Sequence, residues 1–290
     1  MGFRNVVNDG SSNEPRLRLQ QSMAGMRDLG GADAASISQI LDRMAAAGFS
    51  GLEASCRNEQ DADELATMLR DRSLAIGFSA VAENVDDLLN PLELSHRMRA
   101  DYLSVRVLGS LKASPDIAEV LEEMYGLAND AGLPLFIETR AGSITQDLRR
   151  TVKVINRFKK VRFTGDFTDY LAASQLGADW SENVWDHFRQ IARRCGNWHG
   201  TLDASPSALT PQIKKLWILG MVEWQNRARP GDVLPFSCEP GPGGWEQCLA
   251  IKRLLEEAWA QAKLERGPEE NHVTVEVPPP AEIAVNQGMH

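Results

Sequence analysis

Four short apolar runs in the chain each end in a side chain that can bind a divalent metal ion. These side chains are Glu138, Asp166, His199 and Glu239. Each run has the composition of a buried strand, and the carboxyl ends of the strands in a parallel α/β barrel meet on one face. Three carboxylates and one imidazole suit Mn²⁺, Mg²⁺, Co²⁺ or Zn²⁺ as ligands. We therefore expect one divalent metal ion at this face, with Mn²⁺ favoured.

The segments that position these four side chains alternate between strand patterns and helix patterns. Helical segments such as 36–47 carry an apolar stripe on one face, and Gly48 and Gly132 follow two of them at positions typical of helix ends. Regular alternation of this kind predicts a parallel sheet, and eight units in one chain predict a closed (β/α)₈ TIM barrel. The expected strands are 17–21, 51–53, 74–79, 102–107, 135–138, 161–165, 197–202 and 233–238.

An open, doubly wound sheet is the alternative fold. It is disfavoured because no Gly-x-Gly-x-x-Gly sequence follows the first expected strand. We expect a single barrel domain at residues 17–264. A polar segment at residues 1–16 should be mobile. A C-terminal extension at residues 265–290 contains three consecutive prolines, which favour an extended conformation.

Composition and charge exclude several classes of protein. The chain has 290 residues, of which 43% are hydrophobic and 24% charged, and its net charge is −9. An acidic balance argues against binding to a nucleic-acid backbone, and no apolar run approaches the ~20 residues that span a bilayer. The four cysteines form no Cys-x-x-Cys pair. We interpret them as buried free thiols, which suggests a cytoplasmic location.

The segment Gly48-Phe-Ser-Gly-Leu-Glu53 and the ordered set Glu138, Asp166, His199 and Glu239 together resemble a known family. They are similar to the second-strand motif and the strand-five to strand-eight ligands of the xylose isomerase-like barrels, the sugar phosphate isomerase/epimerase superfamily. The resemblance covers residues 17–262. It implies a metal-dependent enzyme that acts on a small carbohydrate and forms a homo-oligomer, either a dimer or a tetramer.

The chain departs from the family pattern where the family often carries histidines. Arg140 stands two residues after the strand-five glutamate, and Asp169 stands three residues after the strand-six aspartate. The end of the third strand reads Gly77-Phe78-Ser79. A DNA-repair nuclease with three metal ions needs more histidines than remain, so this activity is disfavoured, and the substrate of the family's sugar enzymes does not carry over.

The resemblance implies isomerisation or epimerisation of a sugar or keto-sugar, by proton transfer next to a carbonyl. Glu138 and Glu239 would then act both as ligands and as the catalytic proton-transfer groups. Asp203 is a candidate acceptor to orient the imidazole of His199. A metal-dependent dehydratase or lyase that acts on a keto-sugar or keto-polyol is one alternative. A non-catalytic barrel that serves as a binding subunit is another.

Further residues are candidates for contact with the substrate: Arg106, Arg140, Asp169, Trp198 and Glu53. Either arginine could bind an anionic group of the substrate. Each could instead pair with Glu138 or Asp169, because a buried charge needs a partner. Trp198 could form an apolar wall for a sugar ring or pack in the core. Glu53 could contact the substrate, support a ligand or form a structural ion pair.

Overall fold

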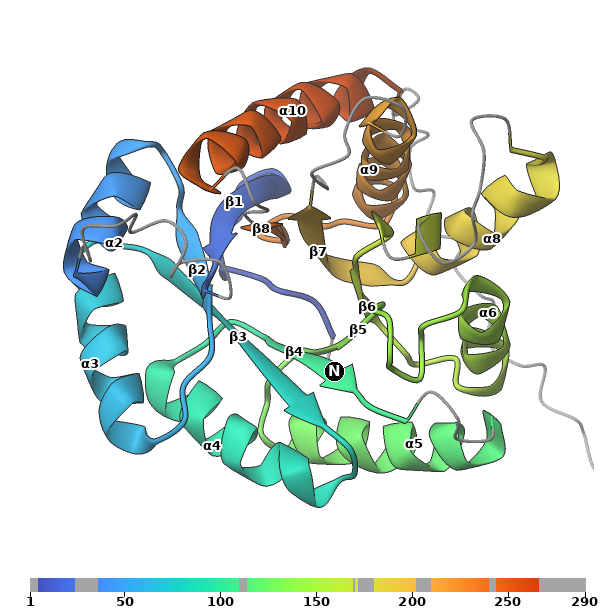
Figure 1. The fold of residues 1–290 in the computed structure, drawn as a ribbon, viewed down its shortest axis with the longest axis horizontal. Helices are drawn as coiled ribbons and strands as arrows, with labels where there is room; N and C mark the ends of the chain where they lie inside the picture. Colours follow the sequence, from blue (N-terminus) through green and yellow to red (C-terminus); the bar gives the residue numbers. More distant parts are fainter. Residues whose placement is uncertain are drawn as a thin grey trace, which may run out of the picture.

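Eight parallel strands close into a barrel in the computed structural model, which describes residues 5–23, 36–109, 114–168, 170–171, 180–201, 210–239 and 244–265 (Figure 1). Each strand pairs with the next in sequence, and β8 pairs with β1 over six registered residue pairs. This closure confirms the barrel and excludes the open sheet. The strands are β1 (Arg16–Ser22), β2 (Gly51–Ala54), β3 (Ala75–Ala82), β4 (Leu103–Val107), β5 (Leu135–Glu138), β6 (Phe163–Gly165), β7 (Cys195–Thr201) and β8 (Val233–Glu239).

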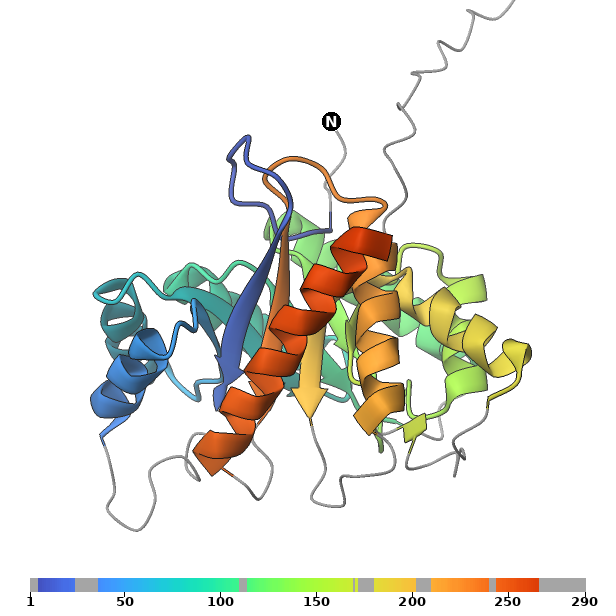
Figure 2. The ribbon, with the colours of Figure 1, turned by 90° about the horizontal axis from the view of Figure 1, so that it is seen from above.

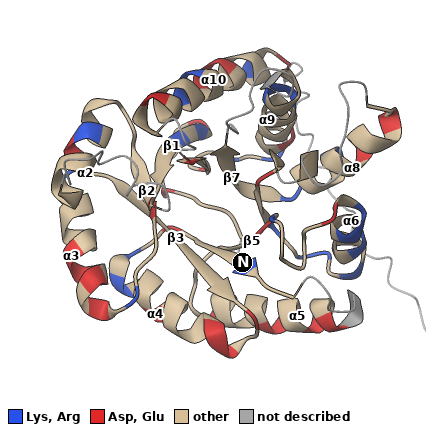
Figure 3. Cartoon of the chain, in the orientation of Figure 1, with Lys and Arg blue, Asp and Glu red and all other residues tan. Residues whose placement is uncertain are grey.

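Helices form a ring outside the strands (Figure 1). Buried apolar side chains fill the layer between this ring and the barrel, and Figure 3 shows charged residues distributed over the outer helices. The helices are α2 (Ile37–Ala46), α3 (Glu59–Arg70), the short 3₁₀ helix η2 (Asp86–Leu88), α4 (Leu89–Met98), α5 (Ser114–Asp130), α6 (Leu148–Arg157), α8 (Glu182–Ala192), α9 (Thr210–Gln225) and α10 (Gly244–Glu265).

Local sequence signals explain where the expected helix at 36–47 begins and ends. Ser36 caps α2 in a capping box with Gln39, in which each side chain bonds the backbone N–H of the other residue. Gly48 lies just beyond the helix with φ of +79°, a left-handed conformation that glycine adopts without strain. Gly132 has φ of +68° after α5, as its position in the sequence predicts.

Two aromatic rings fill the interior of the barrel near the amino ends of its strands. Tyr102 and Phe136 are fully buried and form a small cluster with Val7 and Val233. Glycines make room for them, because a Cβ atom at Gly77 would collide with Tyr102 and one at Gly196 with Phe136. Side chains in a barrel interior pack in layers of this kind.

Residues 5–15 pack against the amino-terminal end of the barrel (Figure 2). The side chain of Asn5 accepts from the backbone N–H of Leu135 and donates to its carbonyl oxygen, both at 2.7 Å. Val7 is buried and accepts from the backbone N–H of Val233. These contacts restrain a part of the segment that we expected to be mobile. The extension beyond residue 265 lies outside the described residues, so the division into domains stays a prediction.

The cysteines are free, as the sequence indicates. Cys195, Cys238 and Cys248 are buried, and Cys56 is partly buried. Among the described residues, no helix combines the length and the apolar character that crossing a bilayer requires.

Candidate functional site

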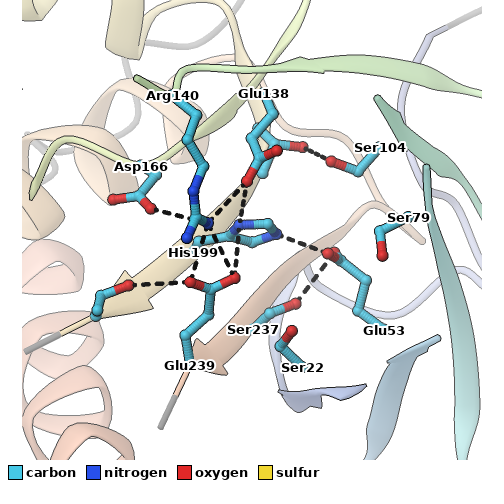
Figure 4. Close-up of polar contacts among 12 residues, drawn as sticks. Ser22, Glu53, Ser79, Ser104, Glu138, Arg140, Asp166, His199, Ser237 and Glu239 are labelled. Carbon is cyan, nitrogen blue, oxygen red and sulfur yellow. Dashed lines mark hydrogen bonds and ion pairs between the residues drawn. The ribbon is translucent and has the colours of Figure 1, made fainter. Parts of the chain in front are cut away.

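Glu138, His199 and Glu239, three of the four proposed ligands, offer ligand atoms that lie within 4.8 Å of one another near the carboxyl ends of β5, β7 and β8 (Figure 4). Asp166, which follows β6, lies beside them. Nδ1 of His199 lies 3.3 Å from Oε1 of Glu138 and 3.3 Å from Oε1 of Glu239. All four side chains are buried, with 2% to 9% of their residue surfaces exposed. We call Glu138, Asp166, His199 and Glu239 the acid cluster.

Hydrogen bonds at the strand ends hold the members of the acid cluster in place. Thr139 follows Glu138, and its buried hydroxyl accepts from the backbone N–H of Asp166 at 2.8 Å. This contact joins the end of β5 to the end of β6. On the other side, Thr201 at the end of β7 donates to Oε2 of Glu239 at 3.3 Å. The strand ends therefore position the carboxylates before any ligand arrives.

The guanidinium group of Arg140 lies among the three carboxylates of the acid cluster (Figure 4). Its Nη1 atom is 3.0 Å from Oε1 of Glu138, 3.1 Å from Oε2 of Glu239 and 3.6 Å from Oδ2 of Asp166. About a third of the Arg140 side chain remains exposed, at 33%. Of the two roles that the sequence leaves open for Arg140, the structure displays the ion pair with Glu138.

Glu53 supports His199 from inside the barrel. Oε1 of Glu53 lies 2.7 Å from Nε2 of His199, while Oε2 accepts from Tyr102, Asn197 and Ser237 at 2.6, 3.0 and 3.2 Å. Only 1% of Glu53 is exposed. Its carboxylate is therefore the group that orients the imidazole, the role for which the sequence suggested Asp203. Asp203 lies outside the described residues.

The buried charges shift one another's pKa values. Burial would raise the pKa of Glu138, but the hydrogen bond and charge of His199 and the charge of Arg140 lower it to about 2. Burial would likewise raise the pKa of Glu53, yet His199 holds it below the ordinary value. For His199, the charges of Glu53 and Glu239 outweigh burial and raise the pKa well above the ordinary value. The carboxylates of Glu53 and Glu138 are thus ionised at neutral pH.

The donor set of the acid cluster fits a divalent metal ion. Nδ1 of His199 is buried and lies 3.3 Å from one carboxylate oxygen of Glu138 and one of Glu239, while Glu53 holds Nε2. Together with Glu53, the cluster contains four carboxyl groups against one imidazole and one guanidinium, an excess of two acidic groups. Oxygen and imidazole ligands in this combination suit several divalent ions, although Arg140 lies close to the same oxygens.

Within the described residues, neither Arg106 nor Trp198 forms a hydrogen bond or an ion pair with the acid cluster. Nη2 of Arg106, on β4, donates to the carbonyl oxygen of Ala141 at 2.6 Å. Trp198 is 1% exposed and packs against Phe167 and Phe236 in the core, on the opposite face of β7 from His199. It therefore does not line the acid cluster. Asp169 lies outside the described residues.

Sequence reasoning missed three residues that hold Glu53: Tyr102, Asn197 and Ser237. A signal for two of them was present. Asn197 and Ser237 each stand two residues before a member of the acid cluster, and strand side chains two residues apart lie on the same face. Nothing in the sequence near Tyr102 marks it as a partner of Glu53.

The geometry can be compared with known proteins. No family model and no curated protein matches the chain. A xylose isomerase-like TIM barrel protein from Mycobacterium smegmatis, in complex with magnesium, is 16% identical with a TM-score of 0.57, and the match covers 87% of this chain and 98% of that one. The D-allulose 3-epimerase of a Methylomonas species, in complex with D-allulose, is 12% identical with a TM-score of 0.56, over 88% and 99% of the two chains.

A probable 3-DHS dehydratase from Bacillus anthracis is also similar in structure. It is 14% identical with a TM-score of 0.54, and the match covers 82% of this chain and 98% of that one. At such low identities these likenesses show the fold alone. The chain has the fold of the xylose isomerase-like TIM barrels.

Proposed function

We propose that the chain is a metal-dependent isomerase or epimerase that moves a proton next to the carbonyl group of a sugar or keto-sugar. The observation that carries this proposal is the convergence of three potential ligand atoms, Nδ1 of His199 and one carboxylate oxygen each of Glu138 and Glu239, at 3.3 Å from Nδ1. Asp166 completes the proposed ligand set from β6. A divalent ion, when bound, supplies a Lewis acid that polarises the carbonyl oxygen of the substrate.

The proton transfer itself falls to carboxylates of the chain. Glu138 and Glu239 end strands β5 and β8, so they approach a substrate at the barrel mouth from different sides. One carboxylate can remove the proton from carbon and the other can return it, as general base and general acid. The lowered pKa of Glu138 keeps its carboxylate ionised at neutral pH, which both a ligand and a base require.

Small polar side chains near Glu53 favour the proposal that the substrate is a carbohydrate. Ser22 and Ser79 come from β1 and β3 and lie beside Glu53 (Figure 4). Serine side chains occupy little volume and carry hydroxyl groups that can both donate and accept hydrogen bonds. The D-allulose bound to the structurally similar Methylomonas epimerase is a sugar of the size that we propose for this site.

A dehydratase or lyase acting on a keto-sugar or keto-polyol is the second candidate, and the position of Arg140 favours a substrate that carries an anionic group. Its guanidinium lies against the acid cluster and its side chain is one-third exposed, so it can bind a substrate carboxylate by charge-assisted hydrogen bonds. The structurally similar protein from Bacillus anthracis is a probable dehydratase. Both reactions begin with removal of a proton next to a carbonyl.

Metal content measured on purified protein tests the proposal first. After incubation with Mn²⁺ and removal of free metal, we expect about one ion per chain in the wild type and less in Glu239→Gln. The exposed Glu256→Gln variant on α10 is the matched control and should retain the ion. If the wild type binds none of Mn²⁺, Mg²⁺, Co²⁺ and Zn²⁺, the proposed mechanism is contradicted. That result favours the hypothesis that the chain is a non-catalytic binding subunit.

Mass analysis of products then separates the two reactions. Candidate substrates such as D-fructose and D-allulose keep their mass if they are isomerised, whereas a dehydrated keto-sugar or keto-acid loses one water. If the wild type binds one metal ion per chain and still converts none of a broad panel of ketoses and keto-acids, that result argues against both the isomerase or epimerase activity and the dehydratase or lyase activity.

A further inference from the structure

A cavity of about 670 Å³ lies at the end of the barrel opposite the acid cluster. It is lined by residues at the amino ends of β5 and β7, by residues just before β6 and β8, and by Asn5 and Val6 of the N-terminal segment. Figure 2 shows this segment at the end opposite the strand arrowheads. The volume falls within the range of pockets that enclose a small organic molecule.

The walls of the cavity combine apolar and cationic side chains. Leu135, Phe158 and Trp224 contribute apolar and aromatic surface. Arg162 and Arg227 contribute two guanidinium groups, and the exposed Lys160 adds an ammonium group. This local excess of positive charge contrasts with the net charge of −9 for the whole chain.

Neither arginine of the cavity forms an ion pair within the described part of the chain. Arg162 donates to the carbonyl oxygens of Val161 and Lys160 at 3.0 and 3.3 Å. Arg227 donates to the carbonyl oxygens of Glu223, at 2.5 Å, and Cys195. These bonds satisfy some guanidinium protons without balancing the positive charges.

The positive charges repel one another across this end of the barrel. Burial is the main cause that lowers the pKa of Arg227 to about 10. The charges of Arg162 and Arg194 also lower this pKa, whereas Cys195 and the charge of Glu223 raise it. Two acidic residues, Glu122 on α5 and Asp232 before β8, also line the cavity, so its three cationic side chains exceed its acidic ones by one. An anion in the cavity would relieve the repulsion.

We propose that this cavity binds a small organic anion, with its carboxylate or phosphate group on Arg162 and Arg227 and its apolar body against Leu135, Phe158 and Trp224. Guanidinium groups match both kinds of oxyanion by paired hydrogen bonds. The site is separate from the acid cluster, because the two lie at opposite ends of the strands. It therefore stands whether or not the proposed metal chemistry is correct.

Fluorescence titration with 8-anilinonaphthalene-1-sulfonate, an aromatic anion, tests this proposal on the full chain. We expect saturable binding of one probe per chain. Affinity should fall about tenfold or more in Arg227→Gln and in Arg162→Gln, because each loses a charge-assisted contact. Arg227→Lys keeps the charge and should lose less. Arg189→Gln is the control, because Arg189 is an arginine of α8 that pairs with Glu182 and Asp186 outside the cavity.

Competition with a matched pair of small molecules tests the recognition of charge. Benzoate should displace the probe from the wild type at lower concentration than benzyl alcohol, which has the same ring without the charge. Circular dichroism establishes that each variant is folded. The proposal fails if wild-type binding does not saturate, if folded Arg227→Gln and Arg162→Gln bind as tightly as the Arg189→Gln control, or if benzyl alcohol competes as well as benzoate.

Discussion

Replacing Arg140 by glutamine should tighten the binding of a divalent metal ion to the acid cluster. In the structure, Nη1 of Arg140 donates to Oε1 of Glu138 at 3.0 Å and to Oε2 and Oε1 of Glu239 at 3.1 and 3.3 Å. The two Oε1 atoms are the ones that face Nδ1 of His199, where a metal ion would also bind. Metal binding must therefore weaken or displace these contacts. Glutamine at this position carries no charge, so the competition between the two cations disappears.

The size of the effect follows from the two contacts. A hydrogen bond to a charged group contributes about 1.5–3 kcal/mol. Because a third of the Arg140 side chain is exposed, solvent screening reduces this contribution to about 1 kcal/mol for each contact. Losing both contacts, about 2 kcal/mol, corresponds to roughly 30-fold tighter metal binding in Arg140→Gln.

Stability should change in the opposite direction when no metal is added. Arg140→Gln removes one of the two cationic groups beside Glu138 and Glu239 and leaves His199. The loss should destabilise the metal-stripped protein by about 2 kcal/mol, less than the roughly 3–5 kcal/mol of a fully buried pair, because Arg140 is partly exposed. Saturating Mn²⁺ should then raise the melting temperature of Arg140→Gln more than that of the wild type, because tighter binding stabilises the folded state more.

Isothermal titration of metal-stripped protein with Mn²⁺ near neutral pH measures the affinity. Arg106→Gln is the matched control, because it also removes a positive charge at the end of a neighbouring strand. The side chain of Arg106 donates to the carbonyl oxygen of Ala141. We expect its affinity to stay within about twofold of the wild type, since a more distant charge is screened by salt. An Arg140→Gln affinity equal to or weaker than that of Arg106→Gln would refute the competition between Arg140 and the metal.

Two further predictions concern the support of the site and the thiols. Glu53→Gln should weaken Mn²⁺ binding by about 10–100-fold, because the carboxylate that orients His199 is lost. The new amide N–H group would also face the hydrogen-bond donors of Tyr102 and Asn197, which now donate to the carboxylate. An unchanged affinity in a titration with Mn²⁺ would contradict this role of Glu53. Burial raises the pKa of Cys56 to about 11 and that of Cys248 to about 11, and it raises those of Cys195 and Cys238 further. In the folded protein we therefore expect all four thiols to react with a disulfide reagent far more slowly than in denaturant, and a thiol that reacts at the denatured rate without denaturant would show that its burial is wrong.

The positions of the strands were predictable because each strand is a local pattern. Apolar runs of four to eight residues between helical stripes mark buried strands, and all eight expected strands are present, with differences only at their ends. The alternation of side chains along a strand also places His199 and Trp198 on opposite faces of β7. Adjacent residues on a strand face opposite sides, so an inward His199 requires an outward Trp198, a rule that argued against Trp198 as a wall of the site.

Partnerships across the barrel were not predictable from local patterns. Glu53 and His199 are 146 residues apart, on β2 and β7. Only closure of the barrel brings their side chains together. Arg140 illustrates a second limit, since the rotamers of a long side chain determine whether its charge turns toward the acid cluster or toward solvent. The packing of Asn5 and Val7 against the barrel depends likewise on distant strands.

The sequence by itself determined the parallel barrel and which strand ends carry Glu138, Asp166, His199 and Glu239, because hydrophobic periodicity and the order of elements are local properties of the chain. The tertiary structure alone decided that Glu53 orients His199, that Arg140 lies between the carboxylates and that Arg162 and Arg227, which form no ion pair within the described residues, line a cavity at the other end. The physical reason is that these arrangements depend on distances of a few ångströms between side chains, which are set only when the barrel closes and its helices pack around it.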